Sequence, residues 1–213
     1  MSEQDIPEPD RVEGAPHPRH SLQVFGHEAA EAEVLDAHAS GRMHHAWLLT
    51  GPRGIGKATL AWRIARFMAA TSPAGQDTGL FGEAPAPTSL DLPEDHPVVR
   101  RSAALAEPGI FLCRRGWDEK AKRLKTQLTV DEIRKMKAHF GLSATDGGRR
   151  AAIVDSADEM NTAAANALLK LLEEPPADTV LLLISHQPAR LLPTIRSRCR
   201  TLRMGLLSPE DMG

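Results

Sequence analysis

The residues best suited to chemistry in this sequence form one glycine-rich stretch, GPRGIGKAT. Its spacing, G-x-x-x-x-G-K, is that of a phosphate-binding loop, in which backbone N–H groups surround a β-phosphate and Lys57 reaches the β- and γ-phosphates. An apolar run, AWLLT, precedes the loop and a stretch with helical spacing follows it, as such a loop requires. The alternative is a glycine-rich turn without a ligand. We predict a nucleotide-binding loop made of Gly51, Pro52, Arg53, Gly54, Ile55, Gly56, Lys57, Ala58 and Thr59.

Two departures from this pattern argue against nucleotide cleavage. Ala58 stands where a Ser or Thr hydroxyl usually ligates Mg²⁺, and Thr59 is rotated from that position by roughly 100° on a helix. The strand-like run RAAIVD ends in Asp155, the place for the acid that holds Mg²⁺, although such an acid could also cap a turn. Its neighbour is Ser156, where hydrolysis needs a Glu, and a missing general base costs about 10²–10⁴-fold in rate.

These losses leave the binding of phosphate less damaged than its cleavage. We expect the loop to hold ATP or ADP with weak or absent Mg²⁺, because the backbone groups and Lys57 remain. The acids that follow, Asp158 and Glu159, lie beyond the end of the apolar run, so we expect them to face away from the site.

The elements around these residues alternate between strands and helices. The run TVLLLIS is typical of a strand that is buried on both faces, and the alternation predicts an α/β fold with a parallel sheet. Residues 1–20 are acidic and rich in Pro, which predicts a disordered arm, and residues 72–108 predict an irregular insertion. Helices are expected over 28–39, 57–70, 133–140 and 161–174, and strands over 46–50, 109–113, 150–155, 179–185 and 200–204.

The overall charge excludes a strongly basic nucleic-acid-binding protein. The chain of 213 residues has 26 Lys or Arg and 28 Asp or Glu, a formal net charge of −2. Residues 114–137 are a local exception, with nine basic and four acidic side chains. In this stretch Arg134 and Lys135 lie on a predicted helix and are candidates for DNA phosphate contacts, the alternative being a solvated charged face.

Targeting and metal-binding signals are not found in the sequence. The first twenty residues have no apolar centre, and no apolar run approaches the about 18 residues that a membrane span needs. The two cysteines, Cys113 and Cys199, cannot form a four-Cys zinc site, so we predict no metal and no zinc. A cytoplasmic location without membrane contact is expected.

Three segments together resemble a known family. FGHEAAEAEVLDAHASGRMHHAWLLTGPRGIGK (25–57), NALLKLLEEPP (166–176) and LLLISHQPARLLPTIRSRC (181–199) are similar to the AAA+ clamp-loader subunits of DNA replication. The likeness runs from about residue 22 to 207, apart from 72–108. Within this family, the degenerate phosphate loop and the missing acid are similar to the delta-prime branch of bacterial DNA polymerase III, whereas gamma/tau subunits keep both features.

The resemblance implies a fold and further site residues. It implies an AAA+ P-loop three-layer domain over 21–207 with a five-stranded parallel sheet, and the beginning of a lid domain at 208–213. It also implies that the phosphate-loop strand lies next to the Asp155 strand and the sensor strand. Ser185 falls at or next to the first sensor position, with His186 the alternative. Arg198 of Ser197-Arg198-Cys199 matches the arginine finger that acts in trans on a neighbouring subunit's ATP; by spacing alone it could be a surface Arg.

The resemblance also implies a function and partners. It implies a subunit that works with gamma/tau and delta subunits to load a sliding clamp on primed DNA, both reached through the complex. Two alternatives stay open at this point: an active gamma/tau-like ATPase, and a stand-alone DNA-binding P-loop module.

Overall fold

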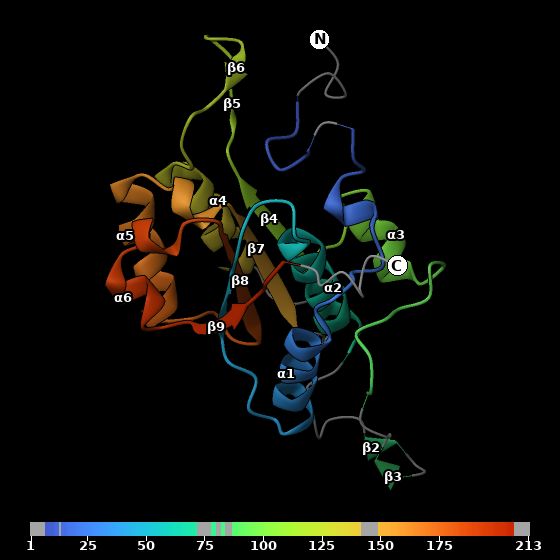
Figure 1. Cartoon of the computed structure of the whole chain (residues 1–213). Helices are drawn as coiled ribbons and strands as arrows, with labels where there is room; N and C mark the ends of the chain where they lie inside the picture. The colour runs from blue at the N-terminus through green and yellow to red at the C-terminus, as the bar shows by residue number, and fades with distance from the viewer. Residues whose placement is uncertain are drawn as a thin grey trace.

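The centre of the molecule is a five-stranded parallel sheet, as predicted. The computed structural model describes residues 7–12, 14–71, 78–79, 82–83, 87–141 and 149–206. The strands follow the order β4-β7-β8-β1-β9 and every neighbouring pair is parallel (Figure 1). Their bounds are Ile110–Arg114 for β4, Arg150–Asp155 for β7, Thr179–Ser185 for β8, Ala46–Thr50 for β1 and Arg200–Arg203 for β9.

The position of β8 corrects the expected strand order. β8 pairs with β1 on one side, with Leu48 opposite Leu183, and with β7 on the other, with Ile153 opposite Leu182. The phosphate-loop strand therefore adjoins the sensor strand, but the Asp155 strand is one place further away. All seven residues of β8 are buried, which suits a strand with partners on both edges and helices on both faces. A site that uses residues from both strands must therefore span the end of β8.

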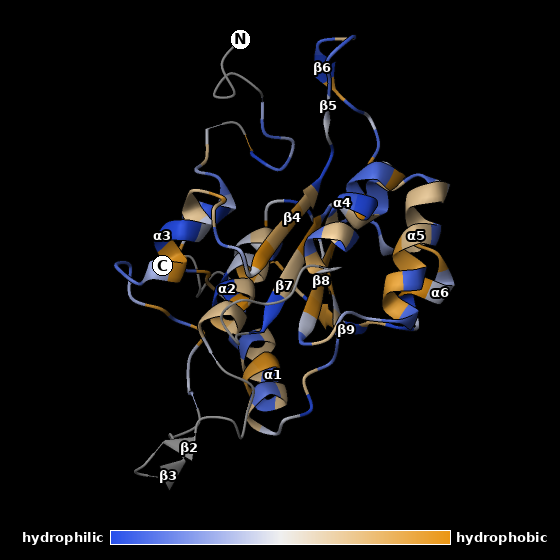
Figure 2. Ribbon diagram, turned by 180° about the vertical axis from the view of Figure 1, so that it is seen from behind, coloured by the Kyte–Doolittle hydropathy of each residue, from blue (hydrophilic) through white to orange (hydrophobic). Residues whose placement is uncertain are grey.

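Helices cover both faces of the sheet. α1 (Glu28–Ala39) and α2 (Lys57–Ala70) lie on one face, and α4 (Val130–Gly141), α5 (Thr162–Glu173) and the short α6 (Pro193–Arg196) lie on the other (Figures 1 and 2). Successive strand side chains point to opposite faces. Trp47 and Leu49 therefore join the core under α2, while Leu48 joins the core under α5. This is the three-layer α/β arrangement that the sequence predicts.

The region expected to be an irregular insertion contains a helix. α3 (Pro97–Ala103) begins after His96, whose Nδ1 accepts the backbone N–H of Val98 at 3.2 Å, and it buries Val98, Val99 and Ser102. The helix is too short to give a recognisable period in the sequence. Two short strands, β2 (Thr78–Gly79) and β3 (Gly82–Glu83), form a hairpin; residues 72–77, 80–81 and 84–86 lie outside the described part.

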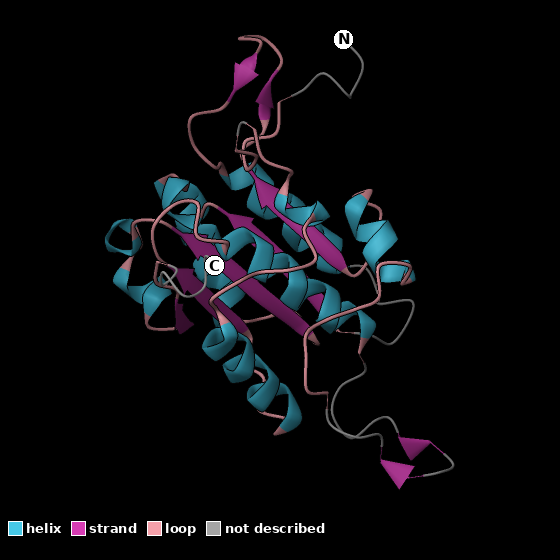
Figure 3. Cartoon of the chain, turned by 45° about the vertical axis from the view of Figure 1, so that its right-hand side comes forward, coloured by secondary structure: helices cyan, strands magenta, loops and turns pink. Residues whose placement is uncertain are grey.

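A second hairpin projects from the end of the sheet that carries Arg114. It consists of β5 (Trp117–Asp118) and β6 (Arg123–Leu124), and it stands clear of the sheet in the views of Figures 1 and 3. The sequence analysis did not anticipate it. Each strand has only two residues, which is too short for an alternating pattern to be recognised.

The N-terminal arm, for which the sequence analysis expects disorder, packs against the domain over residues 7–12 and 14–20. A 3-10 turn, η2 (Pro18–His20), lies against α2. From α2 the buried Arg66 donates to Ser21 O at 3.2 Å and to Arg19 O. A buried guanidinium needs acceptors, and the arm backbone supplies them. Residues 1–6 and 13, and the expected lid start at 208–213, lie outside the described residues.

None of the helices in the described ranges is both long and apolar enough to cross a membrane.

Candidate nucleotide-binding site

The glycine-rich loop adopts a conformation that depends on its glycines. Gly51 has φ 148°, and a Cβ on it would lie 2.2 Å from the carbonyl oxygen of Met204. Gly56 has φ 91°, and a Cβ there would lie 2.9 Å from Val24 Cγ2. Gly56 is also the residue before α2, so the loop delivers the N-terminus of that helix to the site. The local geometry is that of an anion-binding loop.

The loop opens into a cavity of about 310 Å³, at the small end of the usual range of about 300–1,000 Å³ for ligand sites. Most predicted nucleotide-binding residues line it. Three residues of the loop, Gly51, Pro52 and Ile55, do not line the cavity. The residues that the sequence predicts and the cavity brings together are Arg53, Gly54, Gly56, Lys57, Ala58, Thr59 and Asp155.

Lys57 is folded back onto its own loop. Its Nζ donates to Gly51 O at 2.7 Å and to Pro52 O. Burial lowers the pKa of Lys57 to about 8, and the charges of Asp155 and Asp158 oppose this effect. A phosphate would offer the ammonium better acceptors than two carbonyl groups, because hydrogen bonds between ionised groups are stronger than those to neutral ones.

Asp155 lies across the cavity at the end of β7. Its Oδ1 accepts a hydrogen bond from Ser156 Oγ at 2.9 Å. Burial raises the pKa of Asp155 to about 7, and the negative charges of Asp10 and Glu159 act in the same direction. The hydrogen bond from Ser156 and the charge of Lys57 act against it. A carboxyl group that is partly protonated near neutral pH is a weak ligand for Mg²⁺, which needs the charged form.

Of the two candidates for the sensor position, only His186 lines this cavity. His186 lines the cavity, and its Nε2 lies 3.0 Å from Ser156 Oγ. Burial and the charges of Lys57 and Arg53 lower the pKa of His186 to about 4, so the imidazole is neutral at pH 7. Ser185 is fully buried in β8 and does not line the cavity. Of the two alternatives left by the sequence, His186 has the position that can meet a ligand.

The expectation that Asp158 and Glu159 face away from the site was wrong for Glu159, while Asp158 does not line the cavity. A 3-10 turn, η3 (Ala157–Glu159), follows β7 and turns the chain back toward the loop. Asp158 is buried and accepts the backbone N–H of His186 at 3.0 Å. Glu159 lines the cavity and forms ion pairs with Arg53 at 2.9 Å and Arg115 at 2.8 Å. Residue spacing could not indicate this turn.

The N-terminal arm supplies the remaining wall of the cavity, which the sequence analysis missed entirely. Its contributing residues are Pro9, Asp10, Arg11, Val12, Ala15, Pro16, Pro18 and Ser21. No pattern in a Pro-rich acidic segment indicates where it will pack, so no sequence signal was available.

Arg198 lies outside this cavity. It follows α6, and its Nη1 donates to Thr194 O at 3.1 Å while its Nη2 pairs with Glu173 at 3.0 Å. Both side chains of the ion pair are well exposed, at 37% for Arg198 and 52% for Glu173. An exposed pair of this kind contributes little to stability and is readily exchanged for another partner. The guanidinium therefore faces outward and is available to another molecule.

The two candidate DNA contacts are on the surface of α4. Arg134 pairs with Asp131 at 3.1 Å and Lys135 pairs with Glu132 at 3.0 Å, and all four residues lie on α4. In the described part of the chain no group of three or more His, Cys, Asp or Glu side chains is arranged to hold a metal ion.

Comparison with known proteins places this site in a family. Residues 26–207 match the family described as "DNA polymerase III, delta subunit". The delta' subunit of DNA polymerase III from Pseudomonas aeruginosa is 44% identical over 169 residues, which are 78% of this chain and 45% of that protein. The Escherichia coli delta' subunit is 33% identical over 168 residues, 79% of this chain and 44% of that protein. A gamma/tau subunit from Mycobacterium tuberculosis is 31% identical over 201 residues, 92% of this chain and 30% of that protein.

Two solved structures share the fold. A gamma subunit-related protein of DNA polymerase III from Thermotoga maritima has a TM-score of 0.53 and 19% identity, covering 87% of this chain and 47% of its own. The Holliday junction branch migration motor RuvB from the same organism has a TM-score of 0.51 and 14% identity, covering 92% of this chain and 51% of its own. The chain spans less than half the length of the three curated relatives above. With most of its length matched and with this level of identity to delta' proteins, the chain belongs to the DNA polymerase III delta' subunit family.

Proposed function

We propose that this chain is part of a cytoplasmic clamp-loader subunit that helps load a sliding clamp on primed DNA and presents Arg198 to the ATP of a neighbouring subunit. The observation that carries the proposal is that the defects in the chain's own nucleotide cavity and the candidate arginine finger lie at separate places. Its own cavity lacks a hydroxyl at Ala58 and an acid at Ser156, while Arg198 is exposed and lies outside that cavity. The partners are gamma/tau and delta subunits, with the clamp and the DNA reached through the complex.

An active gamma/tau-like ATPase is a weaker proposal. It needs a ligand for Mg²⁺ and a general base next to the attacking water. The carboxylate of Glu159 is the nearest substitute for a base, but Arg53 and Arg115 both hold it. These ion pairs engage both carboxylate oxygens, Oε1 with Arg53 and Oε2 with Arg115, so neither oxygen is placed to receive an attacking water. The third possibility, a stand-alone DNA-binding module, agrees poorly with a net charge of −2.

The cavity itself is proposed to hold nucleotide without a metal ion. Calorimetric titration of the chain with ADP should give a dissociation constant that changes by less than about threefold on adding Mg²⁺, because Ala58 offers no ligand to the ion. Steady-state ATP turnover by the same sample should stay at the background rate. A tenfold gain in affinity with Mg²⁺, or turnover near the usual scale of about 1 s⁻¹, would support the active ATPase instead.

DNA contacts are proposed at the end of the molecule that carries α4 and the β5–β6 hairpin. Arg134 and Lys135 are candidates, although each has a carboxylate partner on α4. On the hairpin, Lys120 and Arg123 are exposed. Among the ion pairs of the described residues, none involves Lys120, Arg123 or Lys125. These three cations can meet phosphate without first breaking an ion pair.

The assembled loader should therefore lose more DNA affinity when the hairpin is neutralised than when α4 is. Replacing Lys120, Arg123 and Lys125 by Ala should reduce the slope of log K against log salt by about 0.9 for each phosphate that the hairpin no longer neutralises. The matched variant Arg134→Ala with Lys135→Ala should change it less. Fluorescence anisotropy with primed DNA at several salt concentrations measures both, and equal slopes for wild type and the hairpin variant would exclude the hairpin.

A further inference from the structure

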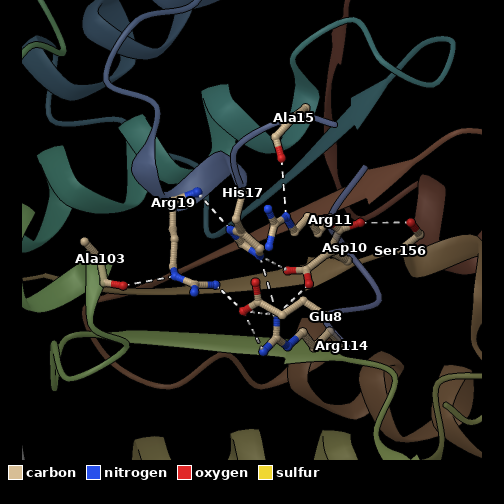
Figure 4. A network of polar contacts seen from close by, with 10 residues as sticks. Glu8, Asp10, Arg11, Ala15, His17, Arg19, Ala103, Arg114 and Ser156 are labelled. Carbon is tan, nitrogen blue, oxygen red and sulfur yellow. Dashed lines mark hydrogen bonds and ion pairs between the residues drawn. The ribbon is translucent and has the colours of Figure 1, made fainter. Parts of the chain in front are cut away.

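The N-terminal arm brings a carboxylate into the nucleotide cavity. Asp10 lines the cavity together with Lys57, Asp155 and Ser156. Its side chain is only 2% exposed, so it is a built-in part of the wall. Figure 4 shows Asp10 within a network of charged side chains from the arm and from β4.

Two cationic or hydrogen-bonding groups hold Asp10 in place. Its Oδ2 lies 2.8 Å from His17 Nε2, and its Oδ1 accepts from Arg114 Nη1 at 2.5 Å (Figure 4). Arg114 is the last residue of β4 and is the register partner of Asp155 on β7. The Asp10 carboxylate is therefore fixed beside the strand end that carries Asp155. Burial raises the pKa of Asp155, and the negative charge of Asp10 acts in the same direction.

This end of the cavity is where a γ-phosphate would lie. Lys57 marks the position between the β- and γ-phosphates, and Asp155 stands on the metal side of it. Three carboxylates line the cavity: Asp10, Asp155 and Glu159. Of the nearby arginines, Arg53 pairs with Glu159 and Arg114 with Asp10, while Arg11, which also lines the cavity, donates to the carbonyl oxygen of Ala15 at 3.3 Å. Because Ala58 gives Mg²⁺ no hydroxyl ligand, a γ-phosphate would meet these carboxylates without the usual screening cation.

We propose that Asp10 is a specificity-determining residue, which makes the cavity accept a nucleoside diphosphate and reject a nucleoside triphosphate. The inference rests on the proposed nucleotide-binding role of the loop. A diphosphate places its phosphates against the loop backbone and Lys57, whereas a triphosphate adds its terminal charge beside Asp10. The arm thus determines which length of phosphate chain the cavity accepts. The glycine loop provides the affinity that is common to both ligands.

Glu8 offers a matched control in the same arm. Its carboxylate also contacts Arg114, at 3.3 Å from Nη1, and it pairs with Arg19. Unlike Asp10, Glu8 lines the neighbouring groove on the β5–β6 side and does not line the nucleotide cavity. A change at Glu8 therefore loosens the same network without altering the charge inside the cavity.

The test is calorimetric titration of the whole chain with ADP and with a non-hydrolysable ATP analogue, without Mg²⁺. Wild type should bind ADP at least tenfold more tightly than the analogue. Asp10→Asn keeps the shape and an acceptor oxygen for Arg114 but removes the charge. It should reduce this preference about tenfold, mainly by tighter binding of the analogue. Glu8→Gln should leave the preference within twofold of wild type.

Three results would overturn the proposal. One is equal binding of the two ligands by wild type. Another is an equal gain for both ligands in Asp10→Asn and Glu8→Gln, which would make the arm a steric cover only. The third is the lack of binding of either ligand up to millimolar concentration in wild type and in Asp10→Asn. Thermal unfolding of each variant checks that it is folded. The proposed role of Arg198 is measured separately, by the ATPase rate of an assembled loader. It does not depend on the outcome of the Asp10 experiment.

Discussion

Replacing Arg198 by Ala in a reconstituted clamp loader is expected to lower its ATPase rate by about 10³-fold at the sites that use this arginine. A guanidinium supplied in trans is worth about 10³–10⁵ in rate, because its planar, permanently charged donors stabilise the charge on a transferring phosphoryl group. Among the residues that the structure describes, the guanidinium of Arg198 contacts Thr194 O and Glu173, and the side chain is 37% exposed. It can therefore leave these contacts at little cost and enter a neighbouring ATP site.

Two further variants make the result specific. Arg196→Ala removes an exposed arginine of α6, two residues away, and should leave the rate within about twofold of wild type, because Arg196 has no role in the proposal. Arg198→Lys keeps the positive charge and loses the planar fork, so it should recover only a small part of the rate. An ATPase rate within threefold of wild type for Arg198→Ala would remove the proposed role in trans.

The second large effect concerns stability and pH. The pKa of Asp155 is about 7 in the folded protein, well above its ordinary value of 3.8. Between these values the folded chain holds a proton that the unfolded chain has released. The contribution of Asp155 to the free energy of unfolding is therefore greatest below pH 4 and is lost as the pH rises toward 7. The loss over the whole range should be about 4 kcal/mol, since the shift spans about three pKa units and each corresponds to about 1.4 kcal/mol.

His186 acts in the opposite direction over part of the same range. The pKa of His186 is lowered from its ordinary value of 6.5 to about 4 in the folded protein. Below pH 6.5 this histidine therefore takes up a proton in the unfolded chain but not in the folded one, which lowers the free energy of unfolding. The contribution of His186 to the free energy of unfolding therefore rises with pH, whereas the contribution of Asp155 falls. Only a comparison of two variants separates them, because the total pH curve contains both contributions.

Urea unfolding of wild type and Asp155→Asn at pH 5 and pH 8 makes this comparison. Relative to wild type, Asp155→Asn should be more stable at pH 8 than at pH 5 by about 2–4 kcal/mol, because the amide has no charge to bury. Asp131→Asn, at an exposed position of α4, should show no such difference. Parallel pH curves for wild type and Asp155→Asn would mean that Asp155 titrates normally.

The local sequence determined the five strands of the central sheet, the helices α1, α2, α4 and α5, and the core of the site. The spacing of apolar residues in AWLLT and TVLLLIS is a property of neighbouring residues, so β1 and β8 could be recognised directly. The same holds for the loop at 51–59, because the need for glycine at Gly51 and Gly56 follows from the backbone itself. The absence of a hydroxyl at Ala58 and of an acid at Ser156 was equally visible.

Tertiary structure alone decided what surrounds that loop. The choice between Ser185 and His186 depends on where β8 ends relative to the cavity, a difference of one residue that reverses the direction of a side chain. Glu159 reaches Arg53 and Arg115 through a turn with no periodic signal. Asp10 and Glu8 meet Arg114 because buried charges need partners, and those partners stand about a hundred residues away in the chain. Pairing over such distances depends on how the strands and the arm pack together, which residue spacing does not encode.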